Sequence, residues 1–296
     1  MKLRSSELFL LSQCAISAVL QAGQIISQYS QHPVATNSKK GGSSLASKVV
    51  TEVDLMCQER ILQTLLPTCD TFDLALLTEE SPDNFSRLKK DFFWCIDPLD
   101  GTLPFIESTP GYAVSIALVA RNGTPHIGVI YDPVEQDLFY AIKDYGVFRN
   151  GNPWKREPVF AISGQSLTFV TDRSFKQNSV FSRVVSELKS IASAMGYDGV
   201  NIIQHGGAVM NACWTLDNSP ACYFKFPKQA EGGGSLWDYA ATACLYLEAG
   251  AVSSDIFGQP LDLNRLDSTF LNHRGILYAS DHAIAKRIMD LYTRLQ

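Results

Sequence analysis

The chain has 296 residues, of which 46% are hydrophobic and 19% are charged. This is the composition of an ordinary globular protein, long enough for one large core or two smaller subdomains. The formal net charge of −5 leaves no basic footprint for a nucleic-acid polymer, and no apolar run approaches the length of a membrane span. We therefore expect neither partner. The seven cysteines have no C-x-x-C spacing, which is typical of reduced thiols in a cytoplasmic protein.

The first part of the chain predicts an antiparallel sheet with helices flanking it. Apolar residues at helical spacing predict a helix over residues 6–29, and a second helix that opens at Asp54 and ends at Pro67. Apolar runs predict strands over residues 75–77, 91–96, 112–120, 126–131 and 138–142. Asn150-Gly151 is a strong turn signal.

In the second part, predicted strands alternate with predicted helices. The strands are expected over residues 167–170, 200–203, 221–226, 251–254 and 276–279, and the helices over 179–195, 207–216, 237–248 and 283–295. Such alternation favours a layered α/β arrangement. We expect the boundary between the two parts near residues 156–165.

The segment from Asp97 to Thr102, with sequence D-P-L-D-G-T, is the most informative in the chain. An extended strand delivers Asp97 to its end, and Pro98 fixes its own φ and offers no N–H, so we expect a turn there. Asp100 follows on that turn, and the carbonyl of Leu99 lies between the two acids in sequence. Hard cations such as Mg²⁺ prefer these oxygen ligands.

Other acids stand beside predicted turns and helix starts: Asp54, Glu79 with Glu80, Glu231 and Asp238. Each also has a plainer interpretation. Asp54 and Asp238 would serve as helix caps or first-turn acids, Asp97 and Asp100 would shape a turn, and the glutamates would be solvated. If the acids do gather, they repel one another unless cations neutralise them, and two or three Mg²⁺ ions would also clamp a phosphate and activate water.

Four segments in this order resemble motifs of the inositol monophosphatase superfamily, a group of lithium-sensitive, Mg²⁺-dependent phosphatases. The resemblance runs from about residue 6 to residue 295. Its motifs are V-T-x-x-D at 50–54, E-E-S at 79–81, D-P-[IL]-D-G-T at 97–102 and W-D-x-A-A at 237–241, the last followed by Glu248-Ala249-Gly250. The resemblance implies two or three Mg²⁺ ions and allows both monomers and homodimers.

The resemblance also implies a role for each matching residue. The first metal ion would be held by Glu79, Asp97 and the Leu99 carbonyl, and the second by Asp97, Asp100 and Asp238. Glu79 would share a third, loosely bound ion. Thr102, oriented by Asp54, would help to deprotonate the attacking water, and Gly101 with Thr102 would cradle the phosphate.

We therefore predict an α/β fold, an α+β layered sandwich with an antiparallel sheet and flanking helices followed by a smaller mixed α/β half. An N-terminal subdomain over residues 1–160 would carry most metal ligands. A C-terminal subdomain over residues 161–296 would carry Asp238 and the substrate contacts.

The substrate, a small phosphorylated metabolite, is less sharply defined. Leu103-Pro104-Phe105 after Thr102 matches neither major branch of the superfamily. Gly206-Gly207-Ala208 and the paired alanines after Asp238 resemble the 3'(2'),5'-bisphosphate nucleotidases, with Gly207 as a substrate contact. Glu231, seven residues before Asp238, lies where inositol monophosphatases place an acid that contacts inositol; its plainer interpretation is an exposed acid beside a glycine loop. His205 has the same two interpretations, substrate contact or satisfied strand-end histidine.

We favour 3'-phosphoadenosine 5'-phosphate as substrate, followed by inositol 1-phosphate and then fructose 1,6-bisphosphate. A different class also stays open, a non-catalytic relative that binds a phosphorylated metabolite. The presence of Asp54 and Thr102 beside the metal-binding acids favours an enzyme, because a binder needs no pair that activates water.

Overall fold

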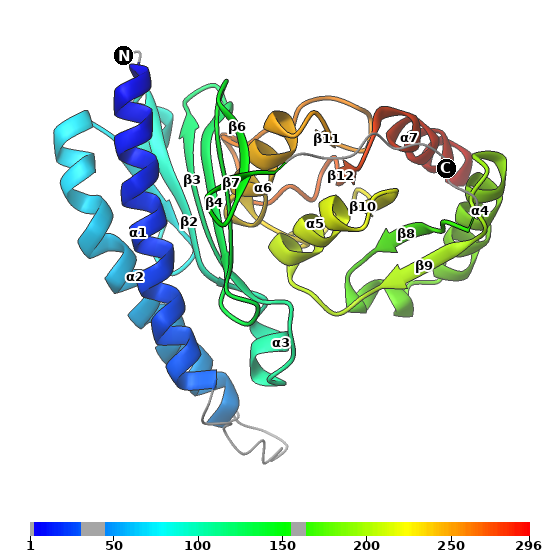
Figure 1. The fold of residues 1–296 in the computed structure, drawn as a ribbon, viewed down its shortest axis with the longest axis horizontal. Coiled ribbons are helices and arrows are strands. Elements are labelled where there is room, and N and C mark those ends of the chain that lie inside the picture. Colours follow the sequence, from blue (N-terminus) through cyan, green and yellow to red (C-terminus); the bar gives the residue numbers. More distant parts are fainter. Residues whose placement is uncertain (1–2, 31–44, 155–163) are drawn as a thin grey trace.

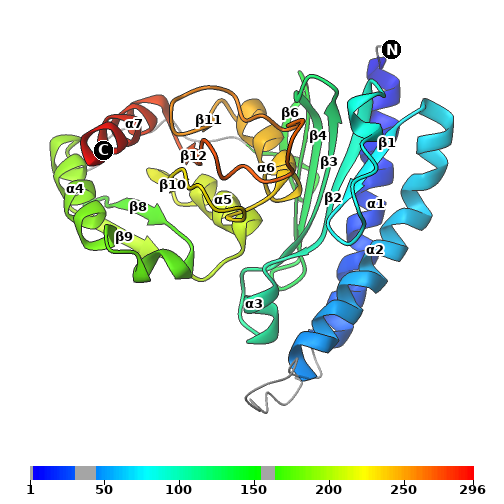
Figure 2. The same cartoon turned by 180° about the vertical axis from the view of Figure 1, so that it is seen from behind.

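A computed structural model of the chain describes residues 3–30, 45–154 and 164–296. The described residues form five layers in the order α, β, α, β, α (Figures 1 and 2). The helix pairs of these layers are, in order, α1 (Ser5–Ser30) with α2 (Leu45–Phe72), α5 (Ala208–Asp217) with α6 (Leu236–Glu248), and α4 (Phe181–Ala194) with α7 (His282–Leu295). The predicted layered α/β fold is confirmed. Apart from residues 164 and 165, the predicted boundary at 156–165 lies outside the described residues.

The larger sheet has seven strands whose spatial order follows the sequence, and α1 and α2 cover one of its faces. Neighbouring strands are antiparallel, as the sequence predicted, except that β1 lies parallel to β2. The turn predicted at Asn150-Gly151 joins the last two strands. The strands are β1 (Ala75–Thr78), β2 (Phe92–Asp100), β3 (Ala113–Ala120), β4 (Pro125–Asp132), β5 (Asp137–Ile142), β6 (Gly146–Arg149) and β7 (Asn152–Pro153).

The smaller sheet is mixed and has the order β11-β12-β10-β8-β9. β8 lies parallel to both β9 and β10, whereas β12 lies antiparallel to β10 and β11. The strands are β8 (Leu167–Val170), β9 (Val200–Ile203), β10 (Ala221–Lys225), β11 (Val252–Ser254) and β12 (Ile276–Ala279). Three short helical segments complete the described elements: η1 (Ser86–Leu88), α3 (Thr102–Ile106) and η2 (Arg173–Gln177).

Helix α6 is the centre of the fold, because it packs against the larger sheet on one side and belongs to the same buried cluster as the smaller sheet. The rings of Tyr239 and Tyr246 on α6 are fully buried near Tyr278 of β12. At Gly128 of β4 the backbone of α6 comes so close that a Cβ atom would lie 2.3 Å from the carbonyl oxygen of Ala241. The start of α6 is therefore fixed relative to the ends of the sheet strands.

Two boundaries differ from the sequence prediction. Pro67 does not end the second helix, which continues to Phe72, because packing of the turns around it outweighs the lost backbone hydrogen bond. Thr68 is buried there and its hydroxyl accepts a hydrogen bond of 2.9 Å from Trp94 Nε1 of β2. The same helix begins at Leu45, so Asp54 lies in its interior, and the prediction that Asp54 opens the helix is wrong.

The strand before the two acids is also longer than predicted. β2 runs through Pro98 to Asp100 instead of turning at Pro98. Its pairing with β3 shifts register between Asp97 and Asp100, so a bulge absorbs the proline while the chain stays extended. Both acids therefore project from an irregular part of a buried strand.

One described helix, α1, is long and apolar enough by length and composition to cross a membrane. This differs from the expectation that no segment approaches that length. In the fold, the face of α1 that includes Leu11, Ala18 and Ile26 is buried with the larger sheet. A core helix passes the same test, so α1 is weak evidence for a membrane.

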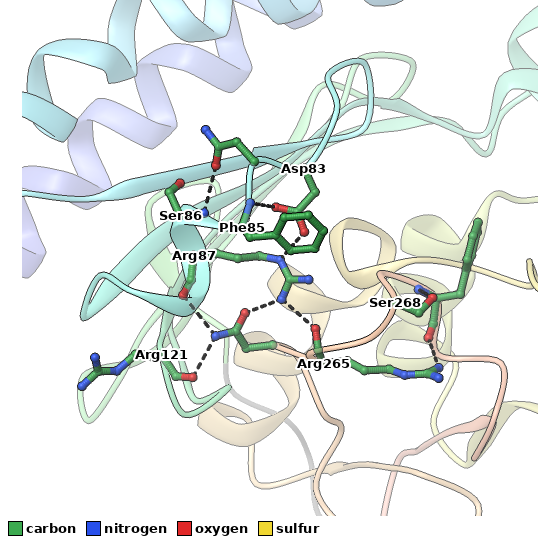
Figure 3. Close-up of polar contacts among 10 residues, drawn as sticks. Asp83, Phe85, Ser86, Arg87, Arg121, Arg265 and Ser268 are labelled. Atoms are coloured by element: carbon green, nitrogen blue, oxygen red, sulfur yellow. Dashed lines mark hydrogen bonds and ion pairs between the residues drawn. The ribbon is translucent and has the colours of Figure 1, made fainter.

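A buried arginine ties the loop after β1 to the C-terminal part of the chain (Figure 3). The side chain of Arg87 is 1% exposed, and its guanidinium contacts Asp83 Oδ2 at 2.8 Å, Asn264 Oδ1 at 2.6 Å and the carbonyl oxygen of Arg265 at 2.8 Å. Asn264 Nδ2 donates in return to the carbonyl oxygen of Arg121 at 2.8 Å. This network fixes the loop that begins with Glu79 against two segments far away in sequence.

The close approach at Gly128 yields a stability prediction. Gly128→Ala is expected to lower the free energy of unfolding by about 1–3 kcal/mol, because the new methyl group would force α6 away from the sheet. Gly199→Ala is the matched control, since its Cβ would meet only Ser166 Oγ at 3.9 Å, and a change within about 0.5 kcal/mol is expected. Urea unfolding measures both. Equal effects in the two variants would contradict the proposed packing constraint.

Candidate metal centre and active-site cleft

Three carboxylates meet where β2 ends and α6 begins. Asp97, Asp100 and Asp238 each offer an oxygen atom, and these oxygens lie within 4.8 Å of one another. Asp97 is buried, and its Oδ1 accepts a hydrogen bond of 3.1 Å from the backbone N–H of Leu99. Its Oδ2 is buried without any hydrogen-bond partner among the described residues. A buried carboxylate oxygen without a donor is a costly arrangement that a cation would relieve.

Asp100 is held by the first turn of α5. Its Oδ1 accepts from the backbone N–H of Ala208 at 3.1 Å and its Oδ2 from that of Val209 at 2.9 Å. Gly207 precedes this turn, and a Cβ atom on it would lie 2.3 Å from Asp100 Oδ2. Gly207, which the sequence suggested as a substrate contact, therefore lies directly against a carboxylate of the cluster.

Asp238 combines the two roles that the sequence left open. It is the third residue of α6, where it forms a capping box with Ser235: its Oδ2 accepts a short hydrogen bond from the Ser235 backbone N–H. The same residue belongs to the carboxylate cluster. The cap interpretation is thus borne out by the geometry, and it does not remove Asp238 from the cluster.

Two further acids face this cluster. Glu79 follows β1, and its charge acts on the carboxyl of Asp97. Asp54 comes from the interior of α2, near Glu79 and Glu80. These five acids come from four segments of the chain, and the candidate Leu99 carbonyl belongs to a buried residue between two of them.

Burial and the closeness of the other carboxylates raise the pKa values of these acids. Burial, followed by the charges of Glu80 and Glu79, raises the pKa of Asp54 to about 8. Glu79 is exposed as a whole residue, but protein around its carboxyl and the charge of Asp238 raise its pKa to about 7. Burial and the neighbouring carboxylates raise the pKa of Asp97 and of Asp100 well above the ordinary range. The cluster therefore holds protons that a bound cation would replace.

These features fit Mg²⁺. The donor set is made of oxygens, and one of them is buried without a partner among the described residues. The residues that would hold the ions are those predicted from the sequence: Glu79, Asp97, Asp100, Asp238 and the carbonyl of Leu99. The number of ions stays a prediction.

Gly101 and Thr102 start helix α3, with Gly101 in the left-handed region at φ 89°. A Cβ atom on Gly101 would lie 2.6 Å from the Gly111 carbonyl oxygen, so only glycine fits this close approach. Thr102 is exposed, and α3 packs against α2, which carries Asp54. Among the described residues, no hydrogen bond joins Asp54 and Thr102, so their predicted pairing stays a prediction.

A cleft of about 350 Å³ opens over Asp100, Gly101, Gly207 and Asp238. Its opposite wall holds residues that the sequence analysis missed. Lys225, the last residue of β10, donates to Asp172 Oδ2 at 2.7 Å and to the Gly233 carbonyl oxygen at 3.0 Å. Its charge opposes the rise in the pKa of Asp100 and Asp238. The only signal in the sequence was a lysine at the end of an apolar strand, because the ion pair joins residues that lie far apart in the chain.

Two predicted substrate contacts have different surroundings. His205 is exposed, lines the cleft and lies against the ring of Trp214, with ring centroids 4.6 Å apart. Glu231 is exposed in the loop before α6 and is not among the described residues that line this cleft. At the end of the strand that leads to that loop, the cleft instead holds the cation Lys225.

The model of the inositol monophosphatase family matches residues 9–294. A relative named Nus factor SuhB, from Haemophilus influenzae, is 29% identical over 242 residues, which cover 81% of this chain and 83% of that protein. The protein of the same name from Escherichia coli is 28% identical over 82% of this chain and 84% of its own length.

Solved structures share the fold. The inositol monophosphatase from Anabaena (Nostoc) has a TM-score of 0.70 at 23% identity and covers 97% of this chain and 96% of its own. Inositol monophosphatase II from Staphylococcus aureus has a TM-score of 0.73 at 20% identity, with 97% and 96% covered. A further neighbour, described as SaIMPase-II with bound 2'AMP, has a TM-score of 0.68 at 20% identity over 94% of this chain and 92% of its own.

The raised pKa values predict how Mg²⁺ stabilises the protein at different pH. In the folded chain Glu79 titrates near pH 7 and Asp54 near pH 8, whereas unfolded carboxyls titrate near pH 4. Between these values the folded state binds more protons, so this cluster lowers the free energy of unfolding as the pH rises. The rise in Tm caused by Mg²⁺ is therefore expected to be larger at pH 8 than at pH 5.5.

Scanning calorimetry with and without Mg²⁺ measures this difference. Because the two Tm values are compared at the same pH, the titration of groups elsewhere contributes equally to both and drops out. Asp97→Asn removes one charge from the cluster and is expected to reduce the Mg²⁺ effect at both pH values. A Tm increase that is the same at pH 5.5 and pH 8 would show that the acids are not the site of stabilisation.

Two substitutions separate the roles of Asp238. Both Asp238→Asn and Asp238→Ala remove the charge, but asparagine keeps an oxygen that can accept from the Ser235 N–H. Both variants are expected to lose most of the Mg²⁺-dependent rise in Tm. Without metal, the alanine variant should be less stable than the asparagine variant by about 1 kcal/mol, the usual worth of a helix cap. Equal metal-free stability would argue against the cap, and an intact Mg²⁺ effect would argue against the ligand.

Proposed function

The chain belongs to the inositol monophosphatase family, and from that membership we propose that it is a Mg²⁺-dependent phosphomonoesterase acting on a small phosphorylated metabolite. The observation that carries the proposal is the carboxylate cluster of Asp97, Asp100 and Asp238, with a buried Asp97 oxygen that has no partner among the described residues. A helix cap or a turn would not need all three acids within 4.8 Å.

Bound Mg²⁺ would supply positive charge for the phosphate and make water a better nucleophile near neutral pH. The chain's own residues orient the reaction. Backbone hydrogen bonds fix Asp100 and Asp238 in place, and Gly101 at the start of α3 lets the backbone approach the cleft closely. In the proposal, Thr102, oriented by Asp54, helps to deprotonate the attacking water by passing its own hydroxyl proton to the Asp54 carboxylate.

For the substrate we propose 3'-phosphoadenosine 5'-phosphate. Lys225 lines the cleft, where it is paired with Asp172, whereas Glu231 is not among the described residues that line it. This supports an anionic substrate over a contact between Glu231 and inositol. The neighbour SaIMPase-II is described both with bound 2'AMP and with bound inositol monophosphate, so this likeness in fold does not distinguish the two substrates. Inositol 1-phosphate and fructose 1,6-bisphosphate remain the alternative substrates. The proposed location is the cytoplasm, with a monomer or homodimer as the unit.

A non-catalytic role is the second candidate, because the curated relatives carry the name Nus factor SuhB. Such a role would not need Thr102 and Asp54 as a pair that activates water. Phosphate release from the three substrates, assayed with and without Mg²⁺, separates the two candidates. No Mg²⁺-dependent release from any of them would favour the non-catalytic role.

Variants test the roles of the acids. Asp97→Asn is expected to lower kcat/KM at least about tenfold below that of Glu79→Gln, a difference of about 1.4 kcal/mol, because Asp97 is proposed to contact both principal ions. Asp70→Asn is the control, since Asp70 is an exposed acid outside the cleft and should leave activity unchanged. Equal residual rates for Asp97→Asn and Glu79→Gln at saturating Mg²⁺ would contradict the assignment of Asp97 as the shared ligand.

A further inference from the structure

Two of the candidate metal ligands lie outside the sheet strands. Glu79 begins the loop that connects β1 to β2, and Asp238 lies in the first turn of α6. After burial, the charge of Asp238 contributes most to raising the pKa of Glu79, so the two carboxyls act on each other across the cluster. Their separation therefore depends on the contacts that hold these two segments together.

Arg87 holds the loop that begins with Glu79 (Figure 3). Its buried guanidinium donates to Asp83 in the same loop, and also to Asn264 Oδ1 and the carbonyl oxygen of Arg265 in a second loop. A planar guanidinium can reach acceptors in several directions at once, whereas the single ammonium of a lysine cannot reproduce that fork. The contacts of Arg87 thus join the two loops.

The first of these loops keeps a strained backbone next to Arg87. Phe85 has a φ of 60°, in the left-handed region that bulky residues rarely adopt, and its side chain is 53% exposed. Burial of the ring therefore does not account for this conformation. The N–H of Phe85 donates to Asp83 Oδ1 at 2.8 Å, and Asp83 Oδ2 accepts from Arg87. Such a conformation persists where the surroundings impose it, so the loop path depends on this network.

Arg265 continues the network toward α6. Its Nη1 donates to the carbonyl oxygen of Phe270 at 2.8 Å, and its Nε donates to Asp267 Oδ1 at 2.6 Å. Phe270 in turn forms an antiparallel bridge with Ser235. Ser235 is the N-cap residue of α6, and its backbone N–H donates to the carboxylate of Asp238. Arg265 is thus connected to Asp238 through one loop and one helix cap.

We propose that Arg87 and Arg265 are positioning residues of the metal centre, which together set the separation of Glu79 and Asp238 and thereby the affinity for Mg²⁺. Neither arginine is among the described residues that line the active-site cleft, so both act through the acids. The inference rests on the metal-binding part of the proposed function. Partners that orient metal ligands from outside the site typically change metal affinity by about 10- to 100-fold.

Calorimetric titration with Mg²⁺, without any substrate, tests the proposal directly. Arg87→Lys keeps the charge but loses the fork, and Arg265→Gln loses the contacts to Asp267 and Phe270. Each variant is expected to raise the Kd for Mg²⁺ about tenfold. Arg265 is 15% exposed, so its variant tests the network even if the buried Arg87→Lys does not fold. An unchanged Kd in Arg265→Gln would contradict the proposal.

Two controls distinguish positioning from general damage. Arg294→Gln removes an arginine that pairs with Glu187 at 3.0 Å, remote from both loops, and should leave the Kd unchanged. Ile288→Ala leaves a cavity in the core that α4 and α7 form with the smaller sheet, so it should lower the Tm without changing the Kd. A rise in the Kd of Ile288→Ala equal to that of the arginine variants would assign Arg87 and Arg265 a merely structural role.

A combined variant tests whether Arg87 acts through Glu79. When Glu79→Gln is already present, Arg87→Lys should raise the Kd by no more than about twofold, because the acid that it positions no longer carries a charge. Independent damage would instead raise the Kd by the same factor in both backgrounds. Equal factors would therefore reject the assignment of Arg87.

Kinetics separates this inference from the proposed function. Both arginine variants are expected to need about tenfold more Mg²⁺ for half of the maximal rate, and to reach a kcat within about twofold of the unmodified protein at saturating Mg²⁺. A loss of kcat that Mg²⁺ does not restore would contradict positioning. Weakened Mg²⁺ binding in the variants, without phosphate release from any ester by the unmodified protein, would retain the positioning residues and reject the phosphatase. Phosphate release with the same Mg²⁺ affinity in all proteins would do the reverse.

Discussion

Repulsion among Asp97, Asp100 and Asp238 is the constraint on which the rest of this structure depends. At the separation of their nearest oxygens, within 4.8 Å, each ionised pair would repel by roughly 3–4 kcal/mol at an effective dielectric constant of 20. No core would retain such a group of charges without support. Three features of the structure reduce this repulsion: the acids keep protons, backbone N–H groups donate to them, and one lysine lies nearby. Bound cations would neutralise the remaining charge.

The support comes from helix starts. The first turn of α5 donates two N–H groups to Asp100, and the residue before α6 donates one to Asp238. The positive ends of these helices thus face the acids, which is the favourable direction of the helix dipole. Helix α6 also packs tightly against the larger sheet at Gly128, so the carboxylate of Asp238 is placed by the core and not by a loop. Stability and metal affinity are consequently linked at this helix.

The five layers bring side chains from both sheets to the same cleft. The larger sheet contributes the acids of β2, whereas the smaller sheet contributes Asp172 and Lys225 at the ends of β8 and β10. Loop contacts such as the one made by Arg87 hold the Glu79 loop to the C-terminal part of the chain. A site assembled between two sheets can therefore change its substrate through the smaller sheet while the metal-binding acids of the larger sheet stay in place.

The sequence alone determined the layered fold class, most of the elements and the identity of the acids, because these follow from local periodicity and from contiguous motifs such as Asp97 to Thr102. It misjudged Pro67 and Pro98, where packing of the helix against Trp94 and a bulge in β2 outweigh the local preference of proline. Only the tertiary structure decided which distant side chains share a cleft. The pairing of Lys225 with Asp172 and the contact of Gly207 with Asp100 join residues whose separation in sequence carries no signal, since contacts between strands and helices depend on how the layers pack.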